Sequence, residues 1–122
     1  MQEIYRFIET CDNVVIASPI YFSELTGKML DVFSRLQMYF SARYFLRKTP
    51  EIKEKKGAVI LSGGGTGDPQ KAYETAVRLL HCINTAKIHP LICSHNTDIV
   101  PVSEDKSVIA EIKSAADFLN AK

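Results

Sequence analysis

The chain has 122 residues, of which 46% are hydrophobic and 24% are charged, and its formal net charge is +1. This length allows one domain with a single core, which we expect to span residues 1–122. A near-neutral balance gives no electrostatic reason to expect nucleic acid or an anionic membrane as a partner. We therefore expect neither of these partners.

The apolar stretches and the cysteines indicate a cytoplasmic protein. The longest apolar runs, such as 57–61, are far shorter than the roughly 20 residues that cross a bilayer. No secretory signal precedes the first amphipathic segment. Cys11, Cys82 and Cys93 form no C-x-x-C pair, and their odd number predicts reduced thiols rather than a disulfide framework.

The first half of the chain alternates between helical and strand patterns. Residues 1–11 carry one apolar stripe at helical spacing. The run Val14–Ala17 is too short for a helix and rich in β-branched residues, which predicts a buried parallel strand. A long helix is expected from Ser23 to about Leu46, and Ala58–Leu61 predicts a second buried strand.

The second half continues this alternation. Asp68 is typical of a helix N-cap, with Pro69 at the first helical position. Ile88–Cys93 predicts a third strand, which Pro90 assigns to an edge of the sheet because proline donates no ladder hydrogen bond. Ser103 is a candidate cap for a last helix. The residues expected to face inward from that helix are Val108, Ile109, Ile112, Ala115, Ala116 and Leu119.

Strands that alternate with helices predict an α/β fold with a parallel sheet covered on both faces. Ligands of such sheets bind beyond the carboxyl ends of the strands. Two unusual segments follow the first two strands, Ser18–Phe22 and Ser62–Gly67. We expect them to meet at one rim of the sheet.

The segment Ser18–Phe22 has two interpretations. A proline directly after a strand forces an extended turn, along which backbone amides and an aromatic ring can lie against a planar ligand. Alternatively, Tyr21 and Phe22 close the top of the core in a tight strand-to-helix connection. The residue types alone leave both interpretations open.

A family resemblance favours the ligand. The segment Asp12–Phe22, with Gly27–Leu36 behind it, resembles the NAD(P)H-dependent FMN reductase and iron–sulfur flavoprotein branch of the flavodoxin-like superfamily. The resemblance implies a flavodoxin-like three-layer sandwich, FMN as cofactor and NAD(P)H as electron donor. It also implies that the S-P-x-Y-x loop wraps the isoalloxazine ring. The implied contacts come from Ser18, Pro19, Ile20, Tyr21 and Phe22.

The glycine-rich segment after the second strand is a weaker signal by itself. Adjacent glycines permit close backbone approach and positive φ, but the same pattern also occurs in mobile surface turns. It is neither a P-loop nor a dinucleotide-binding fingerprint. In the family that the chain resembles, this loop borders the flavin. The resemblance therefore implies cofactor contacts from Ser62, Gly63, Gly64 and Gly65.

The sequence departs from the family at its beginning. Flavodoxin-like domains start with a strand whose following loop holds the FMN phosphate, and a second strand comes next. Met1 corresponds to the helix after these elements, so we expect the phosphate loop and the first two strands to be missing from these 122 residues. This predicts weak or no FMN binding, and a homo-oligomer that covers the exposed edge of the Val14–Ala17 strand. The alternative function is a non-catalytic interaction module without flavin.

The remaining candidates favour no other chemistry. His89, Cys93 and His95 share strand parity, but ordinary structural roles outweigh a metal site. The stripe Met38, Tyr39, Phe40, Tyr44 and Phe45 indicates core packing or a subunit contact. No acid–base pair stands out, so no catalytic residue is assigned. A flavin carries hydride and electrons itself, so this absence counts against a hydrolase and not against a flavoprotein.

Overall fold

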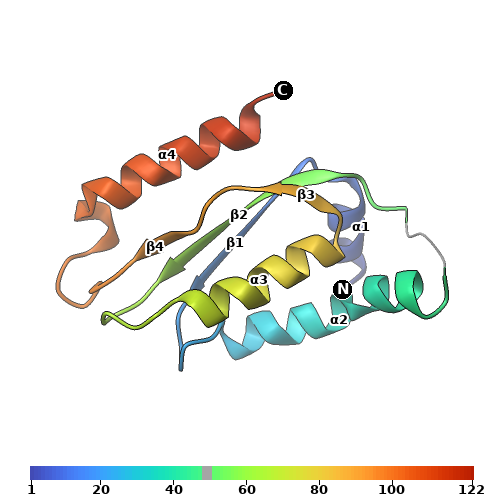
Figure 1. Ribbon diagram of the computed structural model, residues 1–122, viewed down its shortest axis with the longest axis horizontal. Coiled ribbons are helices and arrows are strands. Elements are labelled where there is room, and N and C mark those ends of the chain that lie inside the picture. Colours follow the sequence, from blue (N-terminus) through green and yellow to red (C-terminus); the bar gives the residue numbers. More distant parts are fainter. Residues whose placement is uncertain (48–50) are drawn as a thin grey trace.

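The computed structural model describes residues 1–47 and 51–122. Helices and strands alternate along the chain, as the sequence predicts (Figure 1). The elements are α1 (Gln2–Thr10), β1 (Asn13–Pro19), α2 (Gly27–Tyr44), β2 (Lys55–Ser62), α3 (Gln70–Cys82), β3 (Thr85–Ile88), β4 (Ile92–Ser94), the 3-10 turn η1 (Val102–Glu104) and α4 (Lys106–Asn120). Within the described ranges, no helix is long and apolar enough to span a bilayer.

All strand pairings in the sheet are parallel, which confirms the predicted α/β fold. β1 pairs with β2 along its whole length, from Asn13 opposite Lys56 to Pro19 opposite Ser62. β3 and β4 pair with the other side of β2. β2 is therefore the central strand, and in the described residues β1 has no partner on its outer side.

The third strand differs from its prediction because Pro90 divides it. The run that the sequence predicts as one strand forms two short strands, β3 and β4, with His89-Pro90-Leu91 between them. The His89 amide still donates to the Gly57 carbonyl at 2.9 Å, but Pro90 has no N–H to continue the ladder. The edge position is confirmed, since both short strands pair with β2.

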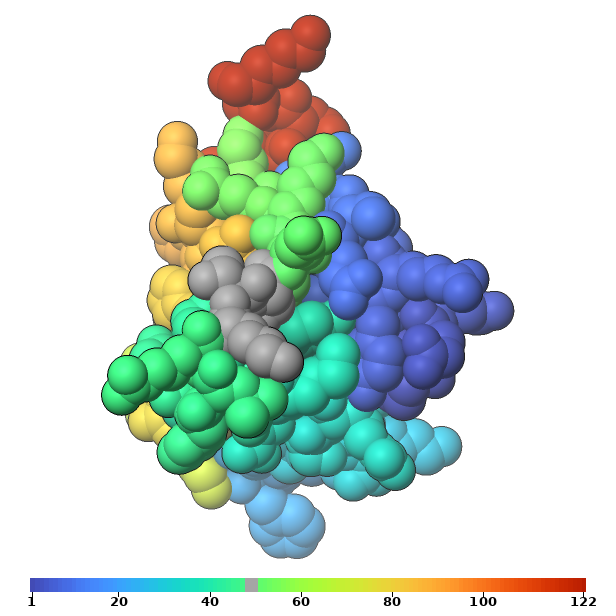
Figure 2. Space-filling model, turned by 90° about the vertical axis from the view of Figure 1, so that its right-hand side faces the viewer, coloured from blue at the N-terminus to red at the C-terminus, as the bar shows by residue number. Residues whose placement is uncertain are grey.

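The helices cover the two faces of the sheet unequally. α1, α2 and α3 pack on one face and α4 alone packs on the other (Figures 1 and 2). β2 is buried from both sides: Val59, in the core beneath α1–α3, is 0% exposed, and Ala58, in the core beneath α4, is 1% exposed. β1 is covered from one side, and the outward-facing Val15 is 49% exposed. An apolar strip of β1 beside α4 is thus open to solvent.

Four helix starts or faces differ from the sequence prediction. α2 begins at Gly27 rather than at Ser23, because the Thr26 hydroxyl caps it by accepting from the Met29 amide at 3.2 Å. Asp105 rather than Ser103 caps α4. Ala116, expected to face inward, is exposed. Pro69 rather than Asp68 is the N-cap of α3, which begins at Gln70, although the Asp68 carboxylate accepts from the Gln70 amide at 2.9 Å.

Candidate functional site

The loops after β1 and β2 lie together at the carboxyl end of the sheet, as predicted. We call the segment 18–26 the aromatic loop and the segment 62–68 the glycine loop. The Ile20 amide donates to the Ser62 carbonyl at 2.8 Å and thereby joins them. Between the loops is a small cavity of about 170 Å³. It is lined by Ile20, Ser23, Gly63, Gly64, Gly65, Gly67 and Asp68.

The tip of the aromatic loop is a tight turn in a rare backbone conformation. Tyr21 and Glu24 exchange two backbone hydrogen bonds, at 2.9 and 3.0 Å. Between them Phe22 and Ser23 have φ values of 50° and 63°, the pattern of a type I′ turn. Such φ values suit glycine and asparagine and cost about 1–2 kcal/mol for other residues. The backbone here stores strain at the rim.

This turn presents its aromatic rings to solvent. Phe22 is 102% exposed and Tyr21 is 60% exposed. The interpretation in which these two rings close the top of the core is therefore wrong. Ile20 points the other way and packs against the main core. The sequence expectation that this loop offers aromatic surface to a ligand is compatible with the geometry.

Polar side chains support the aromatic loop from beneath. The Ser18 hydroxyl donates to the Pro19 carbonyl at 2.8 Å and accepts from the Thr26 amide at 3.3 Å. Glu24 accepts from the Leu25 amide at 2.9 Å and from the Thr75 hydroxyl on α3 at 3.0 Å. Ser18 thus faces the fold, and its role is to hold the loop rather than to border the cavity.

The glycine loop is held mainly through its backbone. The Gly63 amide donates to the Ser94 carbonyl at 2.9 Å, and the Asn96 amide donates to the Gly65 carbonyl at 3.0 Å. None of the glycines has a positive φ, so the expectation of left-handed glycines is not met. At Gly64 a Cβ would lie 2.4 Å from Asp98 Oδ2, whereas at Gly65 and Gly67 it would meet nothing within 4 Å.

The absence of a side chain at Gly65 therefore has no explanation in the packing of the fold. Gly65 borders the cavity, and a side chain there would occupy space that a ligand needs. Within the described residues, the amides of Gly64 and Gly65 donate to no other backbone group. Both remain available as donors to a ligand.

The segment 94–98 is a third part of the site that the sequence analysis missed. Besides the Ser94 and Asn96 contacts, the Thr97 hydroxyl and amide both donate to the Gly63 carbonyl, at 3.2 and 3.1 Å. Asn96 has φ 55°, which asparagine tolerates better than most residues. The position of this segment in the sequence could have predicted its place, because it follows the third predicted strand and so reaches the same rim.

Comparisons with known proteins agree with this geometry. The sequence profile of NADPH-dependent FMN reductase matches residues 1–96. The chain belongs to this family.

An iron–sulfur flavoprotein of Archaeoglobus fulgidus is 31% identical over 80 residues, which are 66% of this chain and 33% of that protein. An iron–sulfur flavoprotein of Methanocaldococcus jannaschii is 27% identical over 81 residues, 66% of this chain and 37% of that protein. The chain thus spans about a third of the length of these curated relatives. An NADPH-quinone reductase from P. pentosaceus shares the fold, with TM-score 0.67, 10% identity and coverage of 99% of this chain and 75% of that one.

The rim of this FMN reductase domain fits a neutral ring edge better than a phosphate. Helix N-termini are the usual phosphate sites, and α2, α3 and α4 all begin at the rim (Figure 1). In each of these helices one first-turn amide already donates to a side chain, that of Thr26, Asp68 or Asp105. The Val108 amide and the Ser107 hydroxyl hold the pKa of the Asp105 carboxyl below its usual value. Two of these three N-termini therefore carry a carboxylate where a phosphate would bind.

Other polar candidates of the sequence have structural roles. His89 lies against α4, with its ring 5.6 Å from that of Phe118, whereas Cys93 packs with the core on the opposite face. Pro90 breaks the strand and with it the predicted shared parity. Within 1–47 and 51–122 no three His, Cys, Asp or Glu side chains are placed to hold a metal ion.

Proposed function

We propose that this domain binds the isoalloxazine ring of FMN between the aromatic loop and the glycine loop, as part of an NAD(P)H-dependent flavin oxidoreductase. The observation that carries the proposal is at Gly65, where a missing side chain and an available amide face a cavity at the rim. Membership of the FMN reductase family supports it. Quinones, free flavin and electron-transfer proteins are the proposed acceptors.

Each part of the site has a role in this proposal. The amides of Gly64 and Gly65 donate to the polar edge of the ring, while Pro19, Ile20 and the rings of Tyr21 and Phe22 flank it. Ser18 and Ser62 position the loops, and Gly63 joins the glycine loop to the segment 94–98. A bound flavin supplies the hydride and electron chemistry, so the protein binds and orients it.

We further propose that the 122 residues alone bind FMN little better than riboflavin, which lacks the phosphate. In the described rim the side chains of Thr26, Asp68 and Asp105 each accept from a first-turn amide of α2, α3 or α4, and two of them carry a negative charge that opposes a dianion. Each charge-assisted hydrogen bond to a phosphate contributes about 1.5–3 kcal/mol. Lacking several of them lowers the affinity for FMN by about a thousandfold relative to a complete site.

The test is a flavin fluorescence titration of the chain with FMN and with riboflavin. We expect similar and weak affinities for the two. Gly65→Ala should weaken both, by about tenfold, because the new methyl group blocks the ring edge. Gly27→Ala is the matched control: its Cβ also meets nothing within 4 Å, but Gly27 lies outside the cavity. Submicromolar FMN binding far above that of riboflavin would refute the phosphate argument.

The alternative function is an interaction module without flavin, and the occupied helix N-termini favour it. Anaerobic addition of NADPH to the chain with saturating riboflavin distinguishes the two. Bleaching of the oxidised flavin absorbance faster than in a protein-free mixture supports the oxidoreductase. Absence of any flavin binding at millimolar concentration would leave the interaction module as the better description.

We also propose that the chain forms a homo-oligomer through β1. This strand has no outer partner in the described residues, and Val15 beside it is 49% exposed. Unpaired edges of this kind template strand addition. Light scattering should show a species larger than 13.7 kDa at tens of micromolar chain, and Val15→Lys should shift it toward that mass. A stable monomer at that concentration contradicts the proposal.

A further inference from the structure

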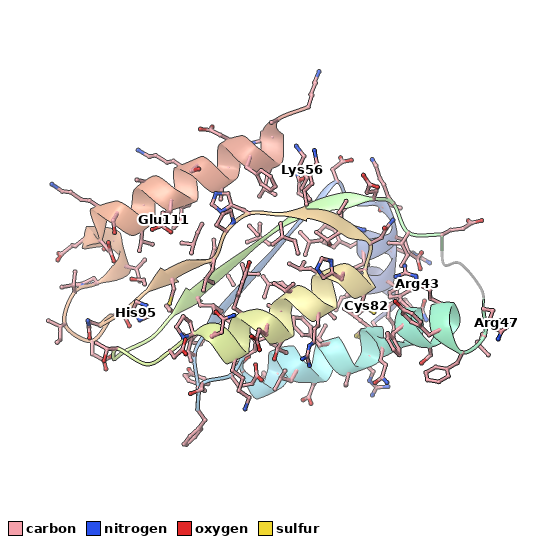
Figure 3. The ribbon with its side chains drawn as sticks, viewed as in Figure 1. Arg43, Arg47, Lys56, Cys82, His95 and Glu111 are labelled. Carbon is pink, nitrogen blue, oxygen red and sulfur yellow. The ribbon has the colours of Figure 1, made fainter. Side chains whose placement is uncertain are left out.

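A second and larger cavity lies between α2 and α3, at the end of the molecule away from the rim. We call it the α2–α3 groove. Its volume is about 670 Å³, inside the range of about 300–1,000 Å³ that small-molecule sites occupy. It is formed by residues between 33 and 44 of α2 and between 75 and 82 of α3, and it shares no lining residue with the cavity at the glycine loop. Figure 3 shows two of its residues, Arg43 of α2 and Cys82 of α3, close together.

The groove carries positive charge without a matching acid. Arg43 and Arg78 line it, and among the described residues no carboxylate does. Neither arginine takes part in an ion pair in the described part of the chain, where Lys53 pairs with Asp12. Arg43 lies in the last turn of α2, where the helix dipole favours a cation. Arg78 is a turn further back, so the dipole does not account for it.

Aromatic rings form the other side of the groove. Phe33, Phe40 and Tyr44 line it, and the Phe40 and Tyr44 rings lie 4.5 Å apart between centroids at an interplanar angle of 36°. These rings are not buried in the core, since Phe40 is 41% exposed and Tyr44 is 62% exposed. Aromatic faces beside guanidinium groups can stack a flat ring and neutralise its negative substituent.

We propose that the α2–α3 groove binds a small planar aromatic molecule that carries one phosphate or carboxylate group. The ring lies against Phe40 and Tyr44, and the anionic group is held by Arg43 and Arg78. The site differs from the proposed flavin site in position and in charge. The glycine loop offers amides to a neutral ring edge, and the groove offers guanidinium groups to an anion.

The probe pair is 1-naphthyl phosphate and 1-naphthol, which share a ring and differ in the anionic group. Titration of the ¹⁵N-labelled chain, followed by amide chemical shifts, should give a dissociation constant of about 0.1–1 mM for 1-naphthyl phosphate. The shifts should concentrate on residues 33–44 and 75–82 and leave 63–67 unchanged. 1-Naphthol should bind at least about tenfold more weakly, because it offers nothing to the arginines.

The variants are Arg43→Gln and Arg78→Gln, each expected to weaken 1-naphthyl phosphate binding by about tenfold. Arg35→Gln is the matched control, since it makes the same change on an exposed part of α2 outside the groove. It should change the affinity by less than about twofold. Arg78 is itself exposed, so its variant keeps the test valid if Arg43→Gln does not fold.

Three outcomes would overturn the proposal. If 1-naphthol bound as tightly as 1-naphthyl phosphate, the anionic group would contribute nothing to binding. If Arg35→Gln weakened binding as much as Arg43→Gln and Arg78→Gln, the loss of affinity would come from the change in net charge and not from a contact in the groove. The third is binding that disappears as the chain concentration rises while sedimentation equilibrium shows a dimer. That result would mean that a second copy of the chain, rather than a ligand, occupies the groove.

Discussion

The two loops of the rim are held in place by different kinds of hydrogen bond. The aromatic loop is fixed by its own side chains, with Ser18, Glu24 and Thr26 bonded to nearby amides, and it contains two left-handed residues that are not glycine. The glycine loop has glycines that are not left-handed, and it depends on backbone contacts from segment 94–98. The residues with positive φ, Phe22 and Ser23, are thus not glycines, and the glycines of the glycine loop have no positive φ that would require glycine.

This contrast separates the needs of the fold from those of a ligand. Side chains that hold the aromatic loop should be costly to remove. Gly65 and Gly67 should be replaceable without loss of stability, because a Cβ at either position meets nothing within 4 Å. The following variants test the two halves of that statement, with urea denaturation as the measurement.

Ser18→Ala should have the largest effect, a loss of about 1–3 kcal/mol in the free energy of unfolding. Ser18 is 6% exposed, and its removal leaves the Thr26 amide and the Pro19 carbonyl without their partner. Ser62→Ala is the control in the glycine loop, since no side-chain hydrogen bond is recorded for Ser62 in the described residues. It should change stability by less than about 0.5 kcal/mol. If Ser18→Ala and Ser62→Ala lost the same free energy of unfolding, the aromatic loop would not depend on its side chains more than the glycine loop does.

Thr26→Ala should destabilise the chain by about 1 kcal/mol, because the α2 N-cap is lost. Thr26→Ser retains the hydroxyl that accepts from the Met29 amide and should recover nearly all of the stability. If the serine variant is as unstable as the alanine variant, the capping hydrogen bond is not what holds this end of the aromatic loop.

Ser23→Gly should stabilise the chain by about 0.5–1 kcal/mol. The relief of a φ of 63° exceeds the entropy that a new glycine costs in the unfolded chain. Phe22→Gly relieves a similar φ of 50° and serves as a second measurement, because Phe22 is fully exposed and contributes no packing. Destabilisation by both substitutions would show that the turn is not strained.

Gly65→Ala should give the smallest effect, a stabilisation of about 0.4–1 kcal/mol. Its backbone is compatible with alanine, and the methyl group meets nothing within 4 Å. The same variant is expected to weaken flavin binding, so stability and binding should change in opposite directions. A clear destabilisation would mean that the fold, rather than a ligand, requires this glycine.

The sequence predicted the parallel sheet and the meeting of the two loops because both follow from short-range patterns. β-Branched runs such as Val14–Ala17 and Ala58–Leu61 identify buried strands, and parallel strands bring their following loops to one edge. The start of α2 was missed because Leu25 continues the helical spacing. Leu25 is indeed buried, at 2% exposure, but it belongs to the turn before Thr26.

The missed features depend on partners far along the chain. The left-handed pair Phe22–Ser23 is imposed by the Tyr21–Glu24 pairing, and neither residue type signals it. The support of the glycine loop comes from Thr97, which lies 34 positions after Gly63. The stripe of Met38 to Phe45 was assigned to the core or a contact. Tyr39 alone of its named members lies in the core, and the others are exposed.

The central position of β2 has a consequence for how the molecule opens. β1, β3 and β4 are each bonded to β2, and in the part of the chain that the structure describes none of them pairs with another strand. An edge strand can therefore detach while β2 keeps its remaining ladder, but β2 cannot detach without dissolving every pairing in the sheet. The amides of Val59 and Leu61 should exchange with deuterated solvent only through global unfolding. Those of Val15 and Cys93, on the edges, should exchange earlier through local opening of single strands.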